Sequence, residues 1–244
     1  MSAERRPLPV DRLLLAALFV TALVTAQLTA AKLLSFQLPF SIPVAGSALT
    51  LPGAALAYAV TYFASDCYAE LYGKQAAREL VNVAFLMNFV VLALVWSTIA
   101  APAADPETAS TFASVLGSAT SIIVASLLAY LVSQNWDVIV FHRLKEFTDG
   151  EMLWLRNIGS TASSQLIDTV IFVGVAFWVL PNLGVGAGMG LPLVGGGPMP
   201  SVAALIVGQY VLKLGIAVID TPFVYAAVAA ARRRDADERR LFTT

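Results

Sequence analysis

Six long apolar segments, separated by loops that alternate between basic and non-basic, constrain the fold of this sequence more than any other feature. Each segment exceeds the roughly 20 residues needed to cross the hydrocarbon core of a bilayer. The segments are apolar all round, whereas a helix on the surface of a soluble domain carries one apolar stripe. The sequence therefore predicts an all-α integral membrane protein, a bundle of six transmembrane helices. The predicted spans are about 12–34, 51–72, 80–101, 114–140, 158–180 and 202–230.

The composition limits which functions this chain can have. Charged residues make up 13% of it, about half the share in a soluble domain. The net charge of −1 gives no reason to expect a nucleic acid partner. The single cysteine, Cys67, excludes an internal disulfide, and the single histidine, His142, excludes a metal site built on a histidine pair. We therefore expect neither a metal nor a cofactor.

The basic residues predict the orientation in the membrane. All but two of the 15 Lys and Arg residues fall in the N-terminal segment, the second and fourth loops, or the C-terminal tail. Cytoplasmic loops are enriched in Lys and Arg, so both termini should be cytoplasmic, in the cell membrane. We expect three parts: an N-terminal segment 1–11, a six-span domain 12–230 and a basic tail 231–244. The first outer loop, about 35–50, is apolar but contains Pro39 and Pro43, so it is either an interfacial loop or a re-entrant segment.

Spans two and four carry pairs of polar residues at helical spacing. Asp66 and Glu70 are four residues apart and so share a helix face. Gln134 and Asp137, three residues apart, also share a face. Glu70 is equally well explained as a solvated residue at the cytoplasmic water line, whereas Asp66 lies one turn deeper. These positions favour a polar lining within the bundle.

Spans five and six contain charges at membrane depth. Asp168 lies roughly 15 Å from the start of span five, near the bilayer centre, and Asn157, Ser164 and Gln165 precede it. Lys213 and Asp220 lie on one stripe of span six. A charge in hydrocarbon costs about 2.5–3.5 kcal/mol or more, so Lys213 should pair with Asp168 or with Asp220. Such a pair could serve the site or simply hold the bundle together.

These side chains together describe a cavity lined by carboxylates, amides and one or two lysines. Carboxylates accept hydrogen bonds, and amides both accept and donate. A flat, neutral, donor-rich ring such as a guanine-like base suits this lining, and nearby aromatic residues could stack on it. No nucleotide-binding motif or nucleophile elbow is present, so neither self-contained ATP coupling nor an enzyme is expected.

Three segments resemble the queuosine precursor transporter family, also called the vitamin uptake transporter family. They run in family order at family-like spacing across spans two to five. The segments are Ser65-Asp66-x-x-x-Glu70-x-Tyr72-Gly73-Lys74, Ser133-Gln134-x-x-Asp137-Val138 and Trp154-Leu155-Arg156-Asn157-x-x-Ser160-Thr161-x-x-Ser164-Gln165-x-x-Asp168-Thr169. Spans one and six match in hydropathy alone, so any role for Lys213 or Asp220 rests on their position in span six.

The resemblance implies a six-span importer of queuosine or archaeosine precursor bases, such as 7-cyano-7-deazaguanine and 7-aminomethyl-7-deazaguanine. Its partners would be this small base and the lipid bilayer, with a homodimer as a possible assembly. Three alternatives remain: a substrate-binding subunit of an ATP-driven vitamin-type importer, a proton-coupled carrier of another heterocycle, and a membrane enzyme. The candidate substrate-binding residues are Asp66, Glu70, Gln134, Asp137, Asn157, Ser164, Gln165, Asp168, Lys213 and Asp220.

Overall fold

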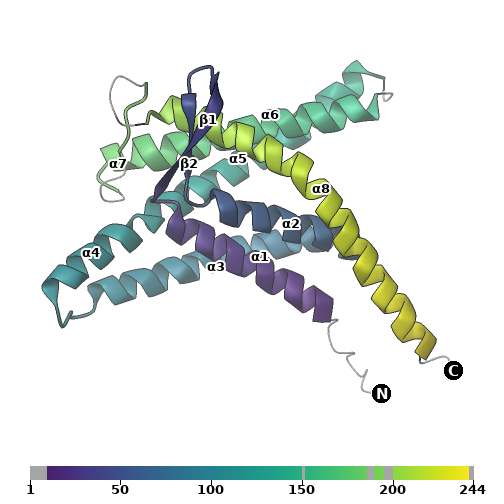
Figure 1. The fold of residues 1–244 in the computed structure, drawn as a ribbon, viewed down its shortest axis with the longest axis horizontal. Helices are drawn as coiled ribbons and strands as arrows, with labels where there is room; N and C mark the ends of the chain where they lie inside the picture. The colour runs from purple at the N-terminus through teal and green to yellow at the C-terminus, as the bar shows by residue number, and fades with distance from the viewer. Residues whose placement is uncertain (1–9, 150–151, 186–189, 195–199, 242–244) are drawn as a thin grey trace.

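Long helices, packed side by side, form most of the molecule (Figure 1). The structure is a computed structural model that describes residues 10–149, 152–185, 190–194 and 200–241, with the side chains at 153–154, 156–157 and 235–241 outside the description. The helices are α1 (Val10–Thr29), α2 (Ala55–Tyr72), α3 (Lys74–Ala100), α4 (Pro106–Gly117), α5 (Ala119–Phe147), α6 (Leu153–Gly174), the π-helical η1 (Val175–Val179), α7 (Leu180–Asn182) and α8 (Val202–Leu241). The strands are β1 (Leu33–Ile42) and β2 (Gly46–Pro52).

Five helical segments are long and apolar enough to cross a membrane, and they account for five of the six predicted spans. They are Val10–Thr29, Lys74–Ala100, Pro106–Phe147, Ile158–Asn182 and Val202–Arg234. The remaining predicted span corresponds to α2, which has 18 residues but carries Asp66, Glu70 and several tyrosines. The chain is thus a multi-pass membrane protein, and the polar residues of α2 reduce the hydropathy of that helix.

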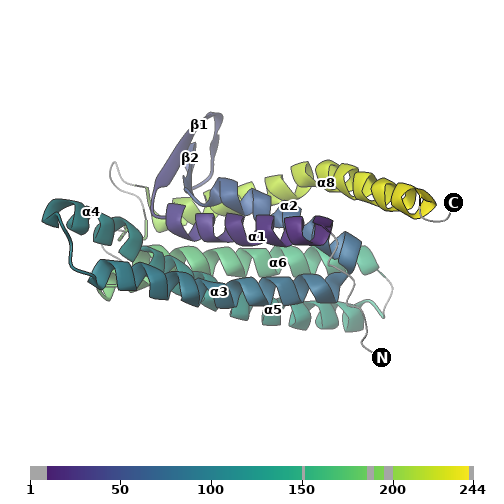
Figure 2. The ribbon, with the colours of Figure 1, turned by 90° about the horizontal axis from the view of Figure 1, so that it is seen from below.

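The first outer loop is a β-hairpin, which the all-α prediction missed. β1 and β2 pair antiparallel in the register Leu33↔Pro52 to Gln37↔Ala48. The register shifts between Gln37 and Ile42, beside Pro39, which has no amide hydrogen to donate. In place of the possible re-entrant loop, the hairpin projects sideways from the helices (Figure 2). The predicted extension of span one to residue 34 is therefore wrong, because α1 ends at Thr29.

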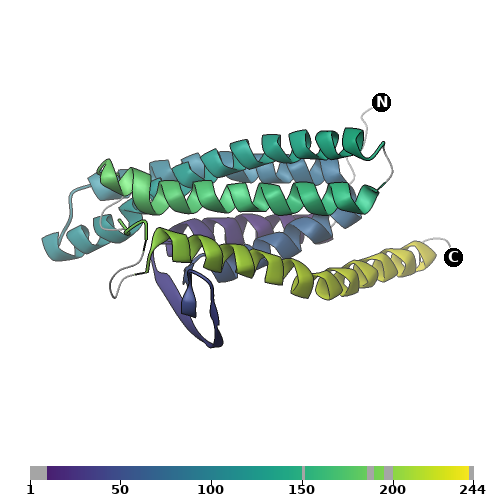
Figure 3. The same cartoon turned by 90° about the horizontal axis from the view of Figure 1, so that it is seen from above.

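The two ends of the bundle are distinct. We call the end that carries the hairpin and α4 the hairpin end, and the opposite end, where α1 begins and α8 finishes, the terminal end (Figure 2). α8 lies along α6 near the hairpin end and then diverges from the bundle (Figure 3). Pro222 lies inside α8, which continues to Leu241, through the segment predicted as a basic tail. An internal proline removes a helical hydrogen bond and favours such a bend.

Small residues bring the elements close together. The largest buried cluster contains Ala26, Ala125 and Ala176 from α1, α5 and η1, packed with Phe177 and Leu205. Alanine and glycine let helix backbones approach, which is how helices associate where lipid supplies no hydrophobic driving force. Gly208 of α8 illustrates this, because a Cβ there would lie 2.5 Å from the carbonyl oxygen of Thr50 in β2. This contact fixes the hairpin against the start of α8.

Candidate functional site

A central cavity of about 320 Å³ lies among α1, α2, α3, α5, α6 and α8. Its volume is at the lower end of the roughly 300–1,000 Å³ typical of small-molecule sites. Five predicted site residues line it: Asp66, Gln134, Gln165, Asp168 and Lys213. The cavity therefore brings together polar residues from spans two, four, five and six.

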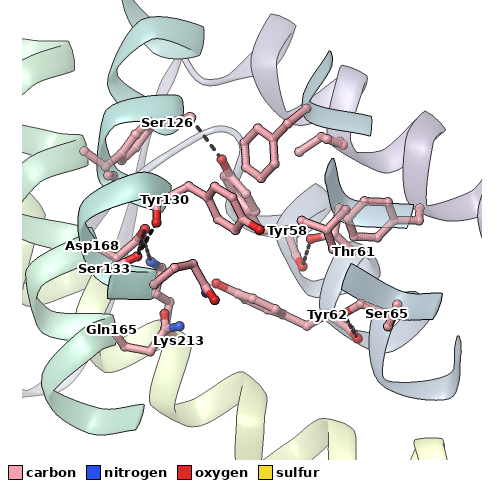
Figure 4. Close-up of a pocket in the computed structure, with 18 of the residues that line it drawn as sticks. Tyr58, Thr61, Tyr62, Ser65, Ser126, Tyr130, Ser133, Gln165, Asp168 and Lys213 are labelled. Atoms are coloured by element: carbon pink, nitrogen blue, oxygen red, sulfur yellow. Dashed lines mark hydrogen bonds and ion pairs between the residues drawn. The ribbon is translucent and has the colours of Figure 1, made fainter. Parts of the chain in front are cut away.

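An ion pair between α6 and α8 crosses one wall of the cavity (Figure 4). Lys213 Nζ donates to Asp168 Oδ2 at 2.5 Å, and Ser133 Oγ donates to Asp168 Oδ1 at 3.4 Å. The Lys213 side chain is 9% exposed and that of Asp168 is 24% exposed. Of the two partners considered for Lys213, the structure selects Asp168. Removing one member of such a buried pair costs about 3–5 kcal/mol, because the remaining charge is left uncompensated.

Tyrosines form the facing wall. Tyr58 and Tyr62 of α2 lie with ring centroids 6.4 Å apart and planes 30° from parallel. The Tyr58 hydroxyl lies 3.5 Å from Ser126 Oγ of α5. Figure 4 shows Tyr62 reaching from α2 toward the side on which Gln165, Asp168 and Lys213 lie. Tyr130 of α5 completes this wall, with its hydroxyl donating to Asn82 Oδ1 at 3.0 Å. A planar ring can stack on these aromatic faces while its edge meets polar groups.

Two glutamines contribute buried acceptors that are unused within the described part of the chain. Gln209 of α8 is 6% exposed. The Oε1 atoms of Gln209 and Gln165 are buried and have no hydrogen-bond partner among the described residues. Both residues line the cavity. A buried acceptor without a partner costs about 1–3 kcal/mol, so each calls for an explanation.

A side groove of about 600 Å³ adjoins the cavity between α2, α6 and α8. Tyr62, Asp66, Gln165 and Lys213 line both spaces, so the cavity and the groove share a wall. Asp220, one of the predicted site residues, lies in this groove and not in the central cavity. Its Oδ2 atom is buried and finds no partner in the part of the chain that the structure describes.

The structure places three predicted site residues away from the cavity. Glu70 is 63% exposed and lies 3.9 Å from Arg232. Ser164 Oγ donates to Asp137 Oδ1 at 3.3 Å, which joins α6 to α5 outside the cavity lining. The side chain of Asn157, also predicted, lies outside the described residues. The spacing grouped Glu70 with Asp66 and Asp137 with Gln134, but only Asp66 and Gln134 line the cavity.

Sequence reasoning missed several lining residues. Gln209 had a usable signal, because it lies four residues before Lys213 and so shares its helix face. Arg78 was assigned to a loop, but α3 begins at Lys74 and carries Arg78 into the lining at the terminal end. The hydroxyl residues gave no signal, since small hydroxyl residues in membrane helices usually serve packing. They are Thr61, Ser65, Ser126 and Ser133.

The cavity is closed toward the hairpin end and open toward the terminal end. Tightly buried residues fill the bundle beyond it at the hairpin end, among them Ile122, Val173 and Leu205. Toward the terminal end the lining contains the exposed residues Asp66 and Gln134. Among the residues described, no cluster of three or more His, Cys, Asp or Glu could hold a metal ion. The site is thus a pocket with packed apolar residues at one end and exposed polar residues at the other.

Membrane-length helices around an ion-paired, aromatic-walled cavity indicate a membrane protein with a small-molecule site inside the bundle. Residues 52–227 match the family described as "Putative vitamin uptake transporter", and the chain belongs to this family. The resemblance seen in the three sequence segments is thus confirmed.

Named relatives agree with this assignment. The chain is 31% identical over 175 residues to the "Probable queuosine precursor transporter" of Bacillus subtilis, covering 70% of this chain and 68% of the relative. It is 26% identical over 132 residues to the "Queuosine precursor transporter" of Escherichia coli, covering 52% of this chain and 56% of that protein. No solved structure matches the chain.

Proposed function

We propose that this protein imports queuosine or archaeosine precursor bases, such as 7-cyano-7-deazaguanine and 7-aminomethyl-7-deazaguanine, for salvage into tRNA modification. The observation that carries the proposal is the central cavity, where tyrosines face an ion pair and two glutamines whose Oε1 atoms have no partner among the described residues. The names of the relatives from Bacillus subtilis and Escherichia coli support the same substrate class.

The chemistry of the cavity suits a flat, neutral base. Tyr58 and Tyr62 offer faces for stacking, at a geometry that aromatic pairs favour. The carboxamides of Gln165 and Gln209 offer acceptors for ring N–H and exocyclic amino donors. The two charges nearest the ligand, on Lys213 and Asp168, cancel each other, so a neutral ligand meets no net charge there.

The proposed orientation makes the cavity accessible from the cytoplasm in this conformation. We take all six predicted spans, α2 included, to cross the cell membrane with the terminal end on the cytoplasmic side. Lys74, Arg78, Arg143, Lys145 and the arginines of α8 gather at that end, as cytoplasmic basic residues do. Import then requires a second conformation in which the packing at the hairpin end opens and the terminal end closes.

Uptake of labelled 7-cyano-7-deazaguanine into liposomes containing only this protein tests the proposal. Uptake above that of empty liposomes, with the recovered compound chemically unchanged, supports a self-sufficient transporter that is not an enzyme. An imposed proton gradient separates coupled from passive transport. Failure of uptake despite binding to the purified protein favours the alternative, a substrate-binding subunit that needs an ATP-hydrolysing partner. Failure of both uptake and binding contradicts the substrate assignment.

The homodimer stays a prediction from the sequence. Light scattering of the detergent-purified protein during size-exclusion chromatography would give its mass directly.

A further inference from the structure

The two glutamines whose Oε1 atoms lack a described partner, Gln165 and Gln209, lie on either side of the ion pair along the bundle. Gln165 lies three residues before Asp168 on α6, and Gln209 lies four residues before Lys213 on α8, so each shares a helix face with its charged neighbour. The two helices run in opposite directions, because α6 starts at the terminal end and α8 starts at the hairpin end (Figure 3). Gln165 is therefore one turn from the ion pair toward the terminal end, and Gln209 is one turn from it toward the hairpin end.

These offsets set the difference in level between the two glutamines along the helices. At 1.5 Å rise per residue, the offsets of three and four residues sum to about 10 Å between the two levels. A bicyclic base with N–H donors on opposite edges, plus a hydrogen bond of about 2.9 Å at each end, spans a distance of this order. The donors on one edge of a guanine-like base lie far too close together to reach both levels. One base can thus satisfy both glutamines only through opposite edges.

Asp168 already has partners within the protein. Its Oδ2 accepts from Lys213, and its Oδ1 accepts from Ser133 at 3.4 Å. Gln165 and Gln209, in contrast, line the cavity, and their Oε1 atoms are buried and have no partner among the residues that the structure describes. A bound base would supply the donors that these oxygens lack without breaking the ion pair.

We infer that Gln165 and Gln209 determine specificity by accepting hydrogen bonds from opposite edges of one free base. One glutamine accepts from the pyrimidine edge, which carries the ring N–H and the 2-amino group. The other accepts from the N–H of the five-membered ring. This inference rests on the proposed function and sharpens its substrate class to bases whose five-membered-ring nitrogen is unsubstituted. The corresponding nucleosides are excluded, because the sugar occupies the nitrogen that must donate.

The test measures binding of three ligands to the detergent-purified full chain. They are 7-cyano-7-deazaguanine, its analogue without the 2-amino group, and its analogue methylated on the five-membered-ring nitrogen. The protein variants are Gln165→Met and Gln209→Met, which keep side-chain length but remove the hydrogen-bonding groups. Gln27→Met is the matched control, because Gln27 is 1% exposed and also lacks described partners for its carboxamide, yet lies outside the cavity lining.

We expect the wild-type protein to bind both analogues about tenfold more weakly than the parent base. Each cavity variant should bind the parent about tenfold more weakly and should lose discrimination against one analogue. The two variants should lose different ones, since each glutamine reads one edge. The control variant should keep the wild-type pattern. A structural role for either glutamine would lower affinity for all three ligands equally.

Several results would overturn the inference. Wild-type discrimination in both cavity variants would remove the glutamines from ligand recognition. Loss of the same discrimination in both would contradict the opposite-edge arrangement. If Asp168→Asn alone lost the discrimination between the parent base and its analogues, the Asp168 carboxylate would be the group that recognises the base. Absence of binding of the parent base to the wild-type protein would defeat the proposed function and this inference with it, whereas the other outcomes leave the proposed function standing.

Discussion

The two ends of the same helices have opposite characters. Toward the hairpin end, α5, α6 with η1, and α8 bury Ile122, Val173, Phe177 and Leu205 in close apolar packing. Toward the terminal end, the same three helices turn Ser133, Gln165, Asp168 and Lys213 into a cavity that opens beside exposed polar residues. Membrane helices can thus combine a packed region and a solvated region along one length. The boundary between the two is the layer of the ion pair.

The difference indicates a division of labour. Packing at the hairpin end supplies stability, whereas the cavity layer is the proposed site of recognition. Substitutions in the cavity layer should therefore remove transport, with a cost in stability where they break the ion pair, whereas substitutions in the apolar layer should lower stability and leave the lining of the cavity intact. The following predictions test that division, from the largest expected effect to the smallest.

The ion pair should give the largest effect on transport. Asp168→Asn should reduce uptake to the level of empty liposomes while folded protein remains in the membrane, because the cavity then carries an unpaired Lys213 ammonium. Lys213→Met should reduce uptake as strongly and should also destabilise the fold by about 3–5 kcal/mol, since a buried carboxylate is left without its partner. Uptake assays and unfolding in detergent, run on the same preparations, measure both effects. Retained uptake in Asp168→Asn would remove this carboxylate from the mechanism.

The next largest effect should be one on stability, caused by substitutions in the apolar layer. Ile122→Ala, at a residue that is 0% exposed, should lower the free energy of unfolding by about 2–5 kcal/mol through the cavity it creates. Val124→Ala, two residues away and 41% exposed, is the matched control and should change it by much less. Denaturant unfolding in detergent compares the two. Equal destabilisation would show that the hairpin end is not the packed region.

Stacking on the tyrosine wall should give a smaller effect, confined to affinity. Tyr62→Leu should weaken binding of 7-cyano-7-deazaguanine about three- to tenfold, because a stacked aromatic pair contributes about 0.5–1.5 kcal/mol. Tyr62→Phe keeps the ring and should bind as the wild type does. Tyr225→Leu removes an exposed tyrosine of α8 and serves as the control. Weakening by Tyr62→Phe equal to that by Tyr62→Leu would mean that the hydroxyl, and not the ring, contacts the ligand.

The sequence predicted the membrane class and five of the six spans approximately, because apolar length is a property of the chain itself. It also predicted that Lys213 pairs with a carboxylate but could not choose between Asp168 and Asp220. Either carboxylate would neutralise the charge of Lys213, and the rotation of α6 relative to α8 determines which of them lies beside it. That rotation depends on packing between helices, which spacing along one helix does not reveal.

The hairpin and the outward-facing polar residues were not predictable for a related reason. Residues 33–52 read as an apolar loop interrupted by prolines, and their pairing depends on the turn at Val44, whose φ is +70°. Asp137 and Glu70 lie three and four residues from another polar residue of the same helix, and residues that do line the cavity show the same offsets. Asp137 instead accepts from Ser164 between α5 and α6, and Glu70 faces solvent. Local periodicity groups residues on a face but does not orient that face.

Glu70 should give the smallest effect and provides the sharpest contrast with Asp168. Both are carboxylates near a cation, but Glu70 and Arg232 are each 63% exposed and lie 3.9 Å apart. An exposed pair of this kind contributes about 0–1 kcal/mol, since water solvates both charges and salt screens them. Glu70→Gln should therefore leave both the uptake rate and the unfolding midpoint close to wild type, measured beside Asp168→Asn in the same liposomes. If Glu70→Gln abolished uptake in folded protein, the contact between α2 and α8 at the terminal end would belong to the transport cycle, and recognition would extend beyond the cavity layer.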